Sequence, residues 1–387
     1  MTENELNKYF ESAEFKAGLA RYEEMISGGV RTYFEAEQLT DIAEYYAKNN
    51  QLEKASEAIE MALKLHPGST DPLIFKARTY MLQGDLAKAY ELAESIPDQG
   101  DREVAFLYAE LMLCEKRPDE AAEYMKTKLL QGEFDDTPEE IYNTVHDITL
   151  LFYDNKFYEH GIQWAQRQMQ YAKNTRHEVE NLLTAKEMLA SCHLGCEHLE
   201  EAIVLFNEVI DGNPYNERAW MILGDIYSIM QQWEKAMDAY DYALAINSEM
   251  YICMLGKANC YSQLGNMEKA AELYDQLSQI GFAPSLVDYH YGLALTLFGK
   301  FDEAIPHLLK SWENPDDDDM LFDSCYNLCL SYLGTGDVKT ASQFFYLAQE
   351  LSPDSPEVND LVSMFQLCLD KLNEFESDVE SKERQND

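Results

Sequence analysis

The densest group of metal-binding residue types in the chain is Cys192-His193-Leu194-Gly195-Cys196-Glu197-His198. Cys192 and Cys196 are four residues apart and can share one face of a helix, with His198 just beyond it. A zinc site needs four ligands in a tetrahedral arrangement, and no second pair at a familiar spacing completes this one. We therefore expect no metal site and no cofactor. A metal protein or enzyme built on Cys192, Cys196 and His198 stays as a minor alternative.

The cysteines are better explained as small core residues. Cys192 and Cys260 occupy the same position of a repeating pattern, and Cys329 occupies a slot that Gly224 and Gly292 take in other copies. A free cysteine packs well as a small hydrophobic residue. Eight thiols at irregular spacing also suit a reducing compartment.

Motifs typical of catalysis are missing from the sequence. It contains no phosphate-binding Gly-x-x-x-x-Gly-Lys-Ser/Thr loop, no His-Glu-x-x-His and no Gly-x-Ser-x-Gly. Adjacent carboxylates such as Glu139-Glu140 are expected by chance in so acidic a chain. The run Asp316–Asp319 lacks the spacing and the glycine of a calcium loop. We expect that the protein is not an enzyme.

The elements that position these residues follow from an internal period. One copy of the pattern, at offsets 0, 3, 4, 7, 16, 20 and 23, comprises Trp220, Leu223, Gly224, Tyr227, Ala236, Tyr240 and Ala243. Its core returns 34 residues later as Ala258, Tyr261, Ala270 and Tyr274, and again as Gly292, Leu295, Ala304 and Leu308. A period of this length indicates stacked supersecondary units. Between turn residues, apolar side chains recur with the helical period.

This pattern resembles the tetratricopeptide repeat, in which each repeat is a pair of antiparallel helices. The resemblance implies an all-α fold, a right-handed superhelical α-solenoid of about nine helix-turn-helix repeats with capping helices at both ends. The small residue that opens each second helix marks the repeats: Ala55, Ala89, Ala121, Gly161, Ala202, Ala236, Ala270, Ala304 and Ala341. We expect the repeats to begin near Ala36, Thr70, Arg102, Tyr142, Leu183, Glu217, Tyr251, Ser285 and Phe322.

The expected organisation has six parts. A capping helix in residues 1–35 (helical over 3–27) precedes three repeats in 36–135, an irregular fourth repeat and joint in 136–182, and five repeats in 183–355. A second capping helix in 356–375 and a disordered polar tail in 376–387 follow. Longer spacings between repeats predict longer loops near 131–139, 173–180 and 314–319, because insertions in repeat arrays usually fall in loops.

Composition limits the partners. The chain has 387 residues, with 30 Lys and Arg against 71 Asp and Glu, and a net charge of −41. Such a polyanion repels nucleic-acid phosphates and anionic membrane surfaces, so we expect neither as a partner. No secretory signal and no apolar run long enough to span a membrane is evident, which predicts a cytoplasmic protein. A monomer is expected, although the oligomeric state stays open.

The resemblance also implies a binding surface. In repeats of this kind, positions 5, 9 and 12 of each first helix line the concave face. The candidates that we select for this groove are Met221, Asp225, Leu255, Asn259, Tyr289, Leu293, Tyr326 and Leu330. The alternative is that these side chains are buried within the array or under the C-terminal helix.

The predicted function is therefore a non-enzymatic scaffold that binds a protein or peptide in its concave groove, through an apolar segment with basic flanks. No consecutive repeats supply the cations that the family's carboxylate-binding members use, since Leu255 and Asp323 stand at two of those positions. One alternative is a structural subunit of a homo- or hetero-oligomer. Another is a secretion-chaperone-like binding protein, suggested by the segment 341–349. The sequence does not identify the ligand.

Overall fold

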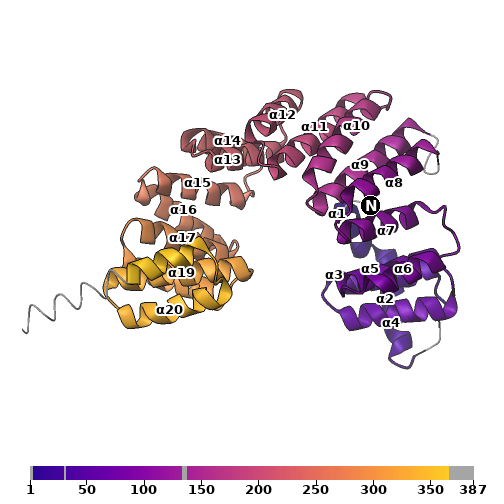
Figure 1. Ribbon diagram of the computed structural model, residues 1–387, viewed down its shortest axis with the longest axis horizontal. Coiled ribbons are helices and arrows are strands. Elements are labelled where there is room, and N and C mark those ends of the chain that lie inside the picture. The colour runs from indigo at the N-terminus through magenta and orange to yellow at the C-terminus, as the bar shows by residue number, and fades with distance from the viewer. Residues whose placement is uncertain (1–2, 30–31, 133–136, 366–387) are drawn as a thin grey trace, which may run out of the picture. The chain divides into compact units, whose positions relative to one another are not determined.

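The computed structural model describes residues 3–29, 32–132 and 137–365, and every regular element in these ranges is an α-helix (Figure 1). The expected all-α class is confirmed. The chain divides into two compact units, residues 1–208 and 209–387. The boundary falls inside α12 (Leu199–Gly212).

Unit 1 consists of helices that pack against their neighbours in chain order. The short turns between partners make each pair antiparallel. The helices of this unit before α12 are α1 (Glu3–Glu11), α2 (Ala13–Ile26), α3 (Ala36–Lys48), α4 (Leu52–Leu65), α5 (Thr70–Leu82), α6 (Leu86–Ser95), α7 (Arg102–Cys114), α8 (Pro118–Leu130), α9 (Pro138–Asp154), α10 (Tyr158–Ala172) and α11 (Glu178–Gly195).

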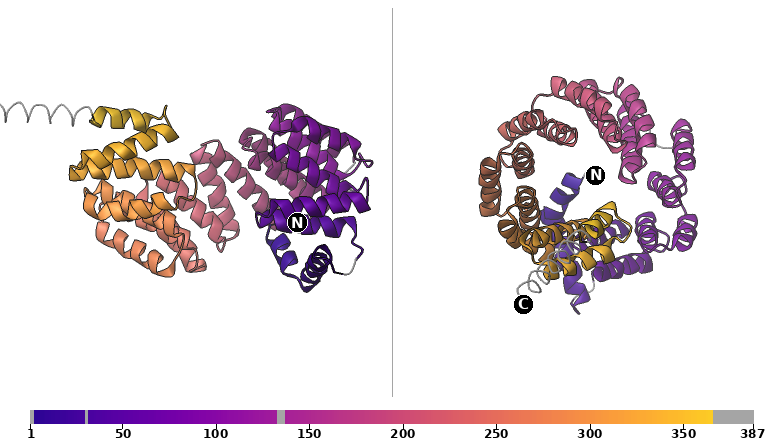
Figure 2. Two further views of the ribbon diagram at one scale, coloured as in Figure 1. Left: turned by 90° about the horizontal axis from the view of Figure 1, so that it is seen from below. Right: turned by 60° about the vertical axis from the view of Figure 1, so that its left-hand side comes forward.

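Unit 2 is built in the same way, and its helices follow one another as neighbouring pairs in both further views (Figure 2). They are α13 (Glu217–Ile229), α14 (Trp233–Ile246), α15 (Tyr251–Gln263), α16 (Met267–Ile280), α17 (Pro284–Leu297), α18 (Phe301–Glu313), α19 (Asp318–Thr335) and α20 (Val338–Leu351). A further helical segment covers residues 356–365.

The turn within each helix pair has one backbone signature. A residue with positive φ lies five positions before the small residue of each second helix. Glycine supplies it at 84, 265, 299 and 336, and other residues supply it elsewhere: Asn50, Lys116, Lys156, Glu197 and Gln231. The left-handed conformation ends the first helix and lets the chain reverse. The alanines that mark the second helices are at most 2% exposed, because the paired helices approach closest there.

Three repeats are longer than the others, and their extra residues lengthen the first helix more than the loop before it. The first helices α3, α5, α7, α13 and α15 each have 13 residues, whereas α9 has 17 and α11 and α19 have 18 each. The prediction of longer loops was thus wrong for most of this excess. N-caps explain the early starts: the Thr137 hydroxyl accepts from the Glu140 amide, and the Asp317 carboxylate accepts from the Met320 amide at 2.7 Å.

The ends differ from expectation in one respect. The single helix expected over residues 3–27 is two helices, because the Ser12 side chain caps a new helix by accepting from the Phe15 amide at 3.1 Å. Phe10 and Phe15 then pack against each other across the break, with tilted rings whose centroids are 4.8 Å apart. The predicted tail, 376–387, and part of the segment 356–375 lie outside the described residues. The capping roles, the number of repeats and the six-part division stay predictions.

None of the described helices combines the length and the apolar character that crossing a membrane requires.

Candidate functional site

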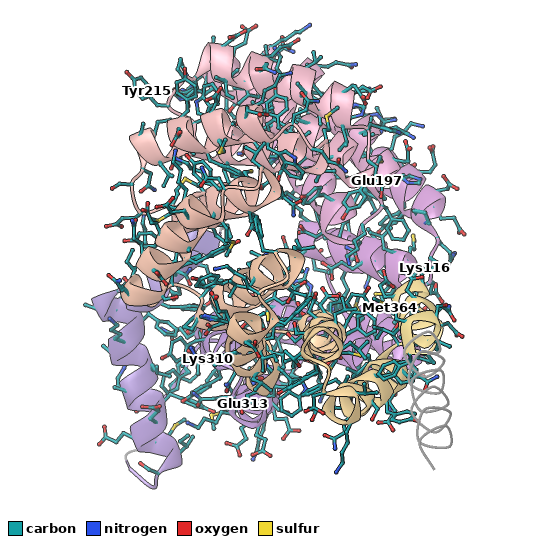
Figure 3. The ribbon with its side chains drawn as sticks, turned by 90° about the vertical axis from the view of Figure 1, so that its left-hand side faces the viewer. Lys116, Glu197, Tyr215, Lys310, Glu313 and Met364 are labelled. Carbon is teal, nitrogen blue, oxygen red and sulfur yellow. The ribbon has the colours of Figure 1, made fainter. Side chains whose placement is uncertain are left out.

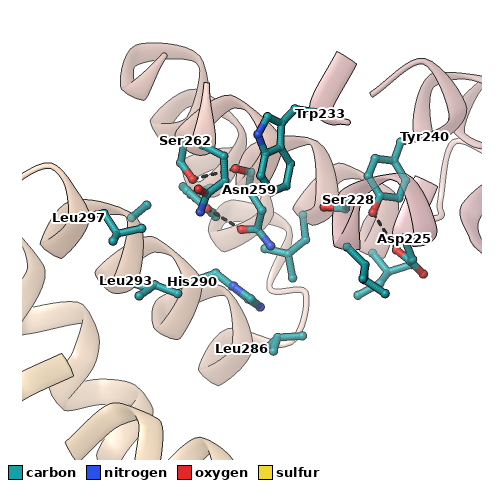
Figure 4. Close-up of a pocket in the computed structure, with 17 residues that line it drawn as sticks. Asp225, Ser228, Trp233, Tyr240, Asn259, Ser262, Leu286, His290, Leu293 and Leu297 are labelled. Carbon is teal, nitrogen blue, oxygen red and sulfur yellow. Dashed lines mark hydrogen bonds between the residues drawn. The ribbon is translucent and has the colours of Figure 1, made fainter. Parts of the chain in front are cut away.

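A groove with a volume of 580 Å³ lies along the first helices of unit 2 (Figure 4). We call it the unit 2 groove. Helices α13, α15 and α17 supply most of its lining, and α14 and α16 supply the rest. The lining residues are Asp225, Ser228, Ile229, Trp233, Tyr240, Ile252, Leu255, Gly256, Asn259, Ser262, Gln263, Tyr274, Leu286, His290, Leu293, Ala294 and Leu297.

One tyrosine explains two glycines of this groove. The ring of Tyr240, on α14, fills the space between α13 and α15. A Cβ atom on Gly224 would lie 2.5 Å from that ring, and one on Gly256 would lie 2.6 Å from it. Only glycine leaves room for the ring at both positions. The Tyr240 hydroxyl therefore reaches the groove, where it donates to Asp225 Oδ1 at 2.7 Å (Figure 4).

The next repeat holds its polar residue in the same way. The Tyr274 hydroxyl donates to Asn259 Oδ1, also at 2.7 Å, and both tyrosines stand 15 residues after their partners. One repeat further on, Leu293 replaces the polar residue and Leu308 replaces the tyrosine. Leu308 packs where a Cβ atom on Gly292 would be, at 2.6 Å. The groove thus changes from a carboxylate to an amide to an apolar side chain over three repeats.

Two ionisable groups in the groove have displaced pKa values. Removal from water raises the pKa of Asp225 above its ordinary value, although the hydrogen bond from Tyr240 acts in the opposite direction. Burial lowers the pKa of His290 to about 4, because the surrounding apolar side chains disfavour the charged imidazolium. His290 is consequently neutral at pH 7, and Asp225 supplies the carboxyl group of the lining.

Half of the predicted site residues line this groove. Asp225, Leu255, Asn259 and Leu293 do, and Leu255 is 2% exposed, so it forms the floor. The other four lie elsewhere: Met221 packs against the core around Tyr240, and Tyr289, Tyr326 and Leu330 pack around the core of α17 to α20. The Tyr289 hydroxyl donates to Asp323 Oδ2 at 3.2 Å. Ligand binding by these eight residues stays a prediction.

Sequence reasoning missed three lining residues with exposed apolar side chains. Ile229 is 62% exposed, Ile252 41% and Leu297 62%. Ile229 and Leu297 end the first helices α13 and α17, at position 13 of their repeats, one position beyond the predicted stripe of positions 5, 9 and 12. Extending that stripe by one residue would have found them.

A second groove, in unit 1, has acidic chemistry. Its volume is 1080 Å³, and we call it the unit 1 groove. Desolvation raises the pKa values of three lining carboxylates, Asp41, Glu44 and Asp71, and repulsion from neighbouring acids adds to the shift. The lining also contains the cations Lys76 and Arg78, and Arg78 is held by Glu110, with Nη2 2.7 Å from Oε1. This groove would favour positive charge on a ligand.

Among the described residues, five cysteines are buried, Cys114 is exposed and Cys196 is partly buried. Cys192, Cys260 and Cys329 are fully buried, which confirms the packing interpretation. Burial raises the pKa of Cys192 to about 12, so its thiol is neutral. The trio of Cys192, Cys196 and His198 is not a ligand set, because the Cys192 thiol faces Gly161 in the core. Cys196 is only partly buried and lies beside Glu159.

Comparison with known proteins finds tetratricopeptide repeats in both halves of the chain. Two models of the tetratricopeptide repeat match the chain, at residues 40–104 and 229–286. No curated protein matches.

Solved structures with similar folds have low sequence identity. Aspartyl phosphate phosphatase F from Bacillus subtilis is 15% identical, with 85% of this chain and 97% of that chain covered and a TM-score of 0.49. The apo form of a quorum sensor from B. thuringiensis is 12% identical, with 81% and 98% covered and a TM-score of 0.49. A tetratricopeptide repeat protein from Parabacteroides merdae is 14% identical, with 86% and 98% covered and a TM-score of 0.44. Likeness at this level carries no argument about partner or function.

Proposed function

The chain belongs to the tetratricopeptide repeat family, and on that premise we propose that it is a non-enzymatic scaffold whose unit 2 groove binds a segment of a partner protein. Proteins of this family generally mediate contacts between proteins. One observation carries the proposal: Ile229, Ile252 and Leu297 are exposed apolar side chains on the lining of one groove. Uncovered apolar side chains that cluster in a concavity are typical of a binding site.

The lining suggests the chemistry of the bound segment. Leu286, Leu293 and Leu297 on α17 favour apolar side chains, as on one face of an amphipathic helix. At the other end, the Asp225 carboxylate would pair with a Lys or Arg that flanks the apolar part. Asp225 has no ion pair among the contacts of the described residues, and its hydrogen bond from Tyr240 fixes its position. A segment that is apolar with a basic flank therefore fits best.

The unit 1 groove supports a second binding surface for a basic segment. Its crowded carboxylates, Asp41, Glu44 and Asp71, repel one another, and a ligand cation would relieve that repulsion. A net charge of −41 favours basic partners over nucleic acid and anionic lipid in the same way. We place the protein in the cytoplasm as part of this proposal, and expect a monomer. A structural role in an oligomer is the rival, and sedimentation equilibrium distinguishes the two.

The test uses short peptides selected from a displayed library on the full chain. We expect the selected peptides to be apolar with Lys or Arg at one end. Leu297→Glu places a charge among the apolar lining without disturbing the core, because Leu297 is 62% exposed. Binding should weaken by at least about tenfold, which corresponds to roughly 1.4 kcal/mol. Fluorescence polarisation measures the affinities.

Ile280→Glu is the matched control. Ile280 is 50% exposed on α16 and does not line the groove, so this variant should bind as the wild type does. Asp225→Asn tests the charge pairing. This variant should no longer prefer peptides with basic flanks over peptides with neutral flanks, while the apolar part of the peptide should still contribute to the affinity. Selected peptides that bind Leu297→Glu as tightly as wild type would refute the groove assignment.

A further inference from the structure

Three residues with metal-binding side chains meet at the turn between α11 and α12. Glu159 lies in the first turn of α10, Cys196 caps the C-terminus of α11, and His198 precedes α12. One ligand atom from each lies within 4.8 Å of those of the other two. All three belong to unit 1, and two distant stretches of sequence contribute to the group.

The backbone turn explains why His198 joins this group. Glu197 has a φ of 61°, the left-handed conformation that ends the first helix of a repeat. The Glu197 amide donates to the Leu194 carbonyl and the His198 amide donates to the His193 carbonyl, each at 2.9 Å. This closure folds the chain back over the last turn of α11 (Glu197 is labelled in Figure 3). It brings Nδ1 of His198 to 3.4 Å from Nδ1 of His193.

The two imidazole nitrogens form a long hydrogen bond of 3.4 Å, and this separation also equals that of two nitrogens on a tetrahedral metal. With Zn–N bonds of about 2.0–2.1 Å, two nitrogens on one tetrahedral zinc are about 3.4 Å apart. The ligand atoms of Glu159, Cys196 and His198 lie within 4.8 Å of one another, and side-chain rotation can bring them closer. Thiolate, imidazole and carboxylate together form a ligand set that suits zinc.

We propose that Glu159, Cys196 and His198 bind Zn²⁺, with His193 as the fourth ligand, and that the metal ties the turn after α11 to α10. This set differs from the one that the sequence suggested, because Cys192 points into the core and Glu159 is 37 residues upstream. The Glu159 carboxylate contributes a negative charge to the group, which favours a cation. Cys196 is only partly buried, so an ion can enter from solvent.

Zinc binding would displace the proton of the Cys196 thiol, and the resulting thiolate and the Glu159 carboxylate would become ligands. The site is independent of the unit 2 groove, so it can exist whether or not the groove binds a peptide.

The experiment titrates the full chain, free of tags and kept reduced, with Zn²⁺ alone in competition with a chromophoric chelator. We expect one equivalent to bind, and Glu159→Gln, Cys196→Ser and His198→Gln each to weaken binding by at least about 100-fold. With Co²⁺ as the probe, a thiolate-to-cobalt charge-transfer band should appear in wild type and be lost in Cys196→Ser. Circular dichroism checks that each variant is folded.

Two controls match the ligands in residue type. Cys114→Ser removes an exposed thiol outside the group, and His160→Gln removes a histidine that neighbours Glu159 but contacts Asp119 at 3.0 Å. Both should bind Zn²⁺ like wild type. Failure of the folded protein to bind one equivalent, or unchanged affinity in Cys196→Ser or in His198→Gln, overturns the proposal.

Discussion

The Sγ atom of Cys192 occupies the space beside Gly161 where any other residue would place its Cβ atom. A Cβ atom on residue 161 would lie 2.7 Å from that sulfur, closer than packed atoms come. Gly161 stands where the other marked second helices have alanine. Glycine at this position leaves the room that the Cys192 sulfur occupies, and Cys192 is fully buried there.

This relationship predicts a coupled pair of mutations. Gly161→Ala should lower the free energy of unfolding by about 1–3 kcal/mol, because the added methyl overfills a packed core. Combining it with Cys192→Ala should recover much of that loss, since the smaller side chain vacates the space. Urea denaturation of the two single variants and the double variant measures the coupling. Additive effects would show that the two residues do not compete for one space.

Some turns place a residue other than glycine at a positive φ, and replacing that residue with glycine should stabilise the protein. Gln231 has a φ of 59° in the turn before α14, at the position where Gly265 and Gly299 stand in later repeats. Gln231→Gly should raise the free energy of unfolding by about 0.5 kcal/mol, since the strain removed exceeds the entropy that glycine adds to the unfolded chain.

Gln83→Gly is the comparison for that variant. Gln83 is also a surface glutamine at the end of a first helix, but its φ is −81°. Glycine relieves no strain there and only adds freedom to the unfolded chain, so the variant should be destabilised. Thermal unfolding that moves both variants in the same direction would contradict the role assigned to the positive φ.

His290 predicts a loss of stability in mild acid. Its pKa is about 4 in the folded protein against 6.5 for the free side chain, so the unfolded chain binds a proton that the folded protein does not. Stability should therefore fall as the pH drops from 6.5 towards 4. In His290→Gln this part of the fall should be missing, as urea midpoints measured at several pH values can show. Parallel pH curves for the two proteins would exclude this role.

Tyr289 and Tyr326 test how far the binding surface extends beyond the unit 2 groove. Neither lines the groove, but both were selected from the sequence as parts of one continuous stripe. If the ligand runs on towards α19, Tyr289→Ala with Tyr326→Ala should weaken peptide binding by about tenfold or more while circular dichroism stays unchanged. If the double variant bound the peptide with wild-type affinity, the binding surface would be limited to the lining of the unit 2 groove.

The repeating pattern by itself determined the fold class. Paired helices need alanine where they approach most closely, and each helix needs apolar side chains at the helical spacing. These requirements are local, so every repeat shows them in its own sequence. Helix starts at Ala36, Thr70, Arg102, Glu217 and Tyr251 agree with the expected beginnings of repeats. The repeat pattern also predicted that Cys192, Cys260 and Cys329 are buried, because equivalent positions of the repeats have equivalent surroundings.

Only the tertiary structure decided which side chains share a site. Spacing along α11 suggested Cys192 as the partner of Cys196, but packing against Gly161 turns Cys192 inward and a different helix brings Glu159 instead. The groove depends likewise on Tyr240, which reaches Asp225 from the second helix of its repeat. Such contacts are set by how one helix lies on another, which the apolar pattern within a single helix does not specify.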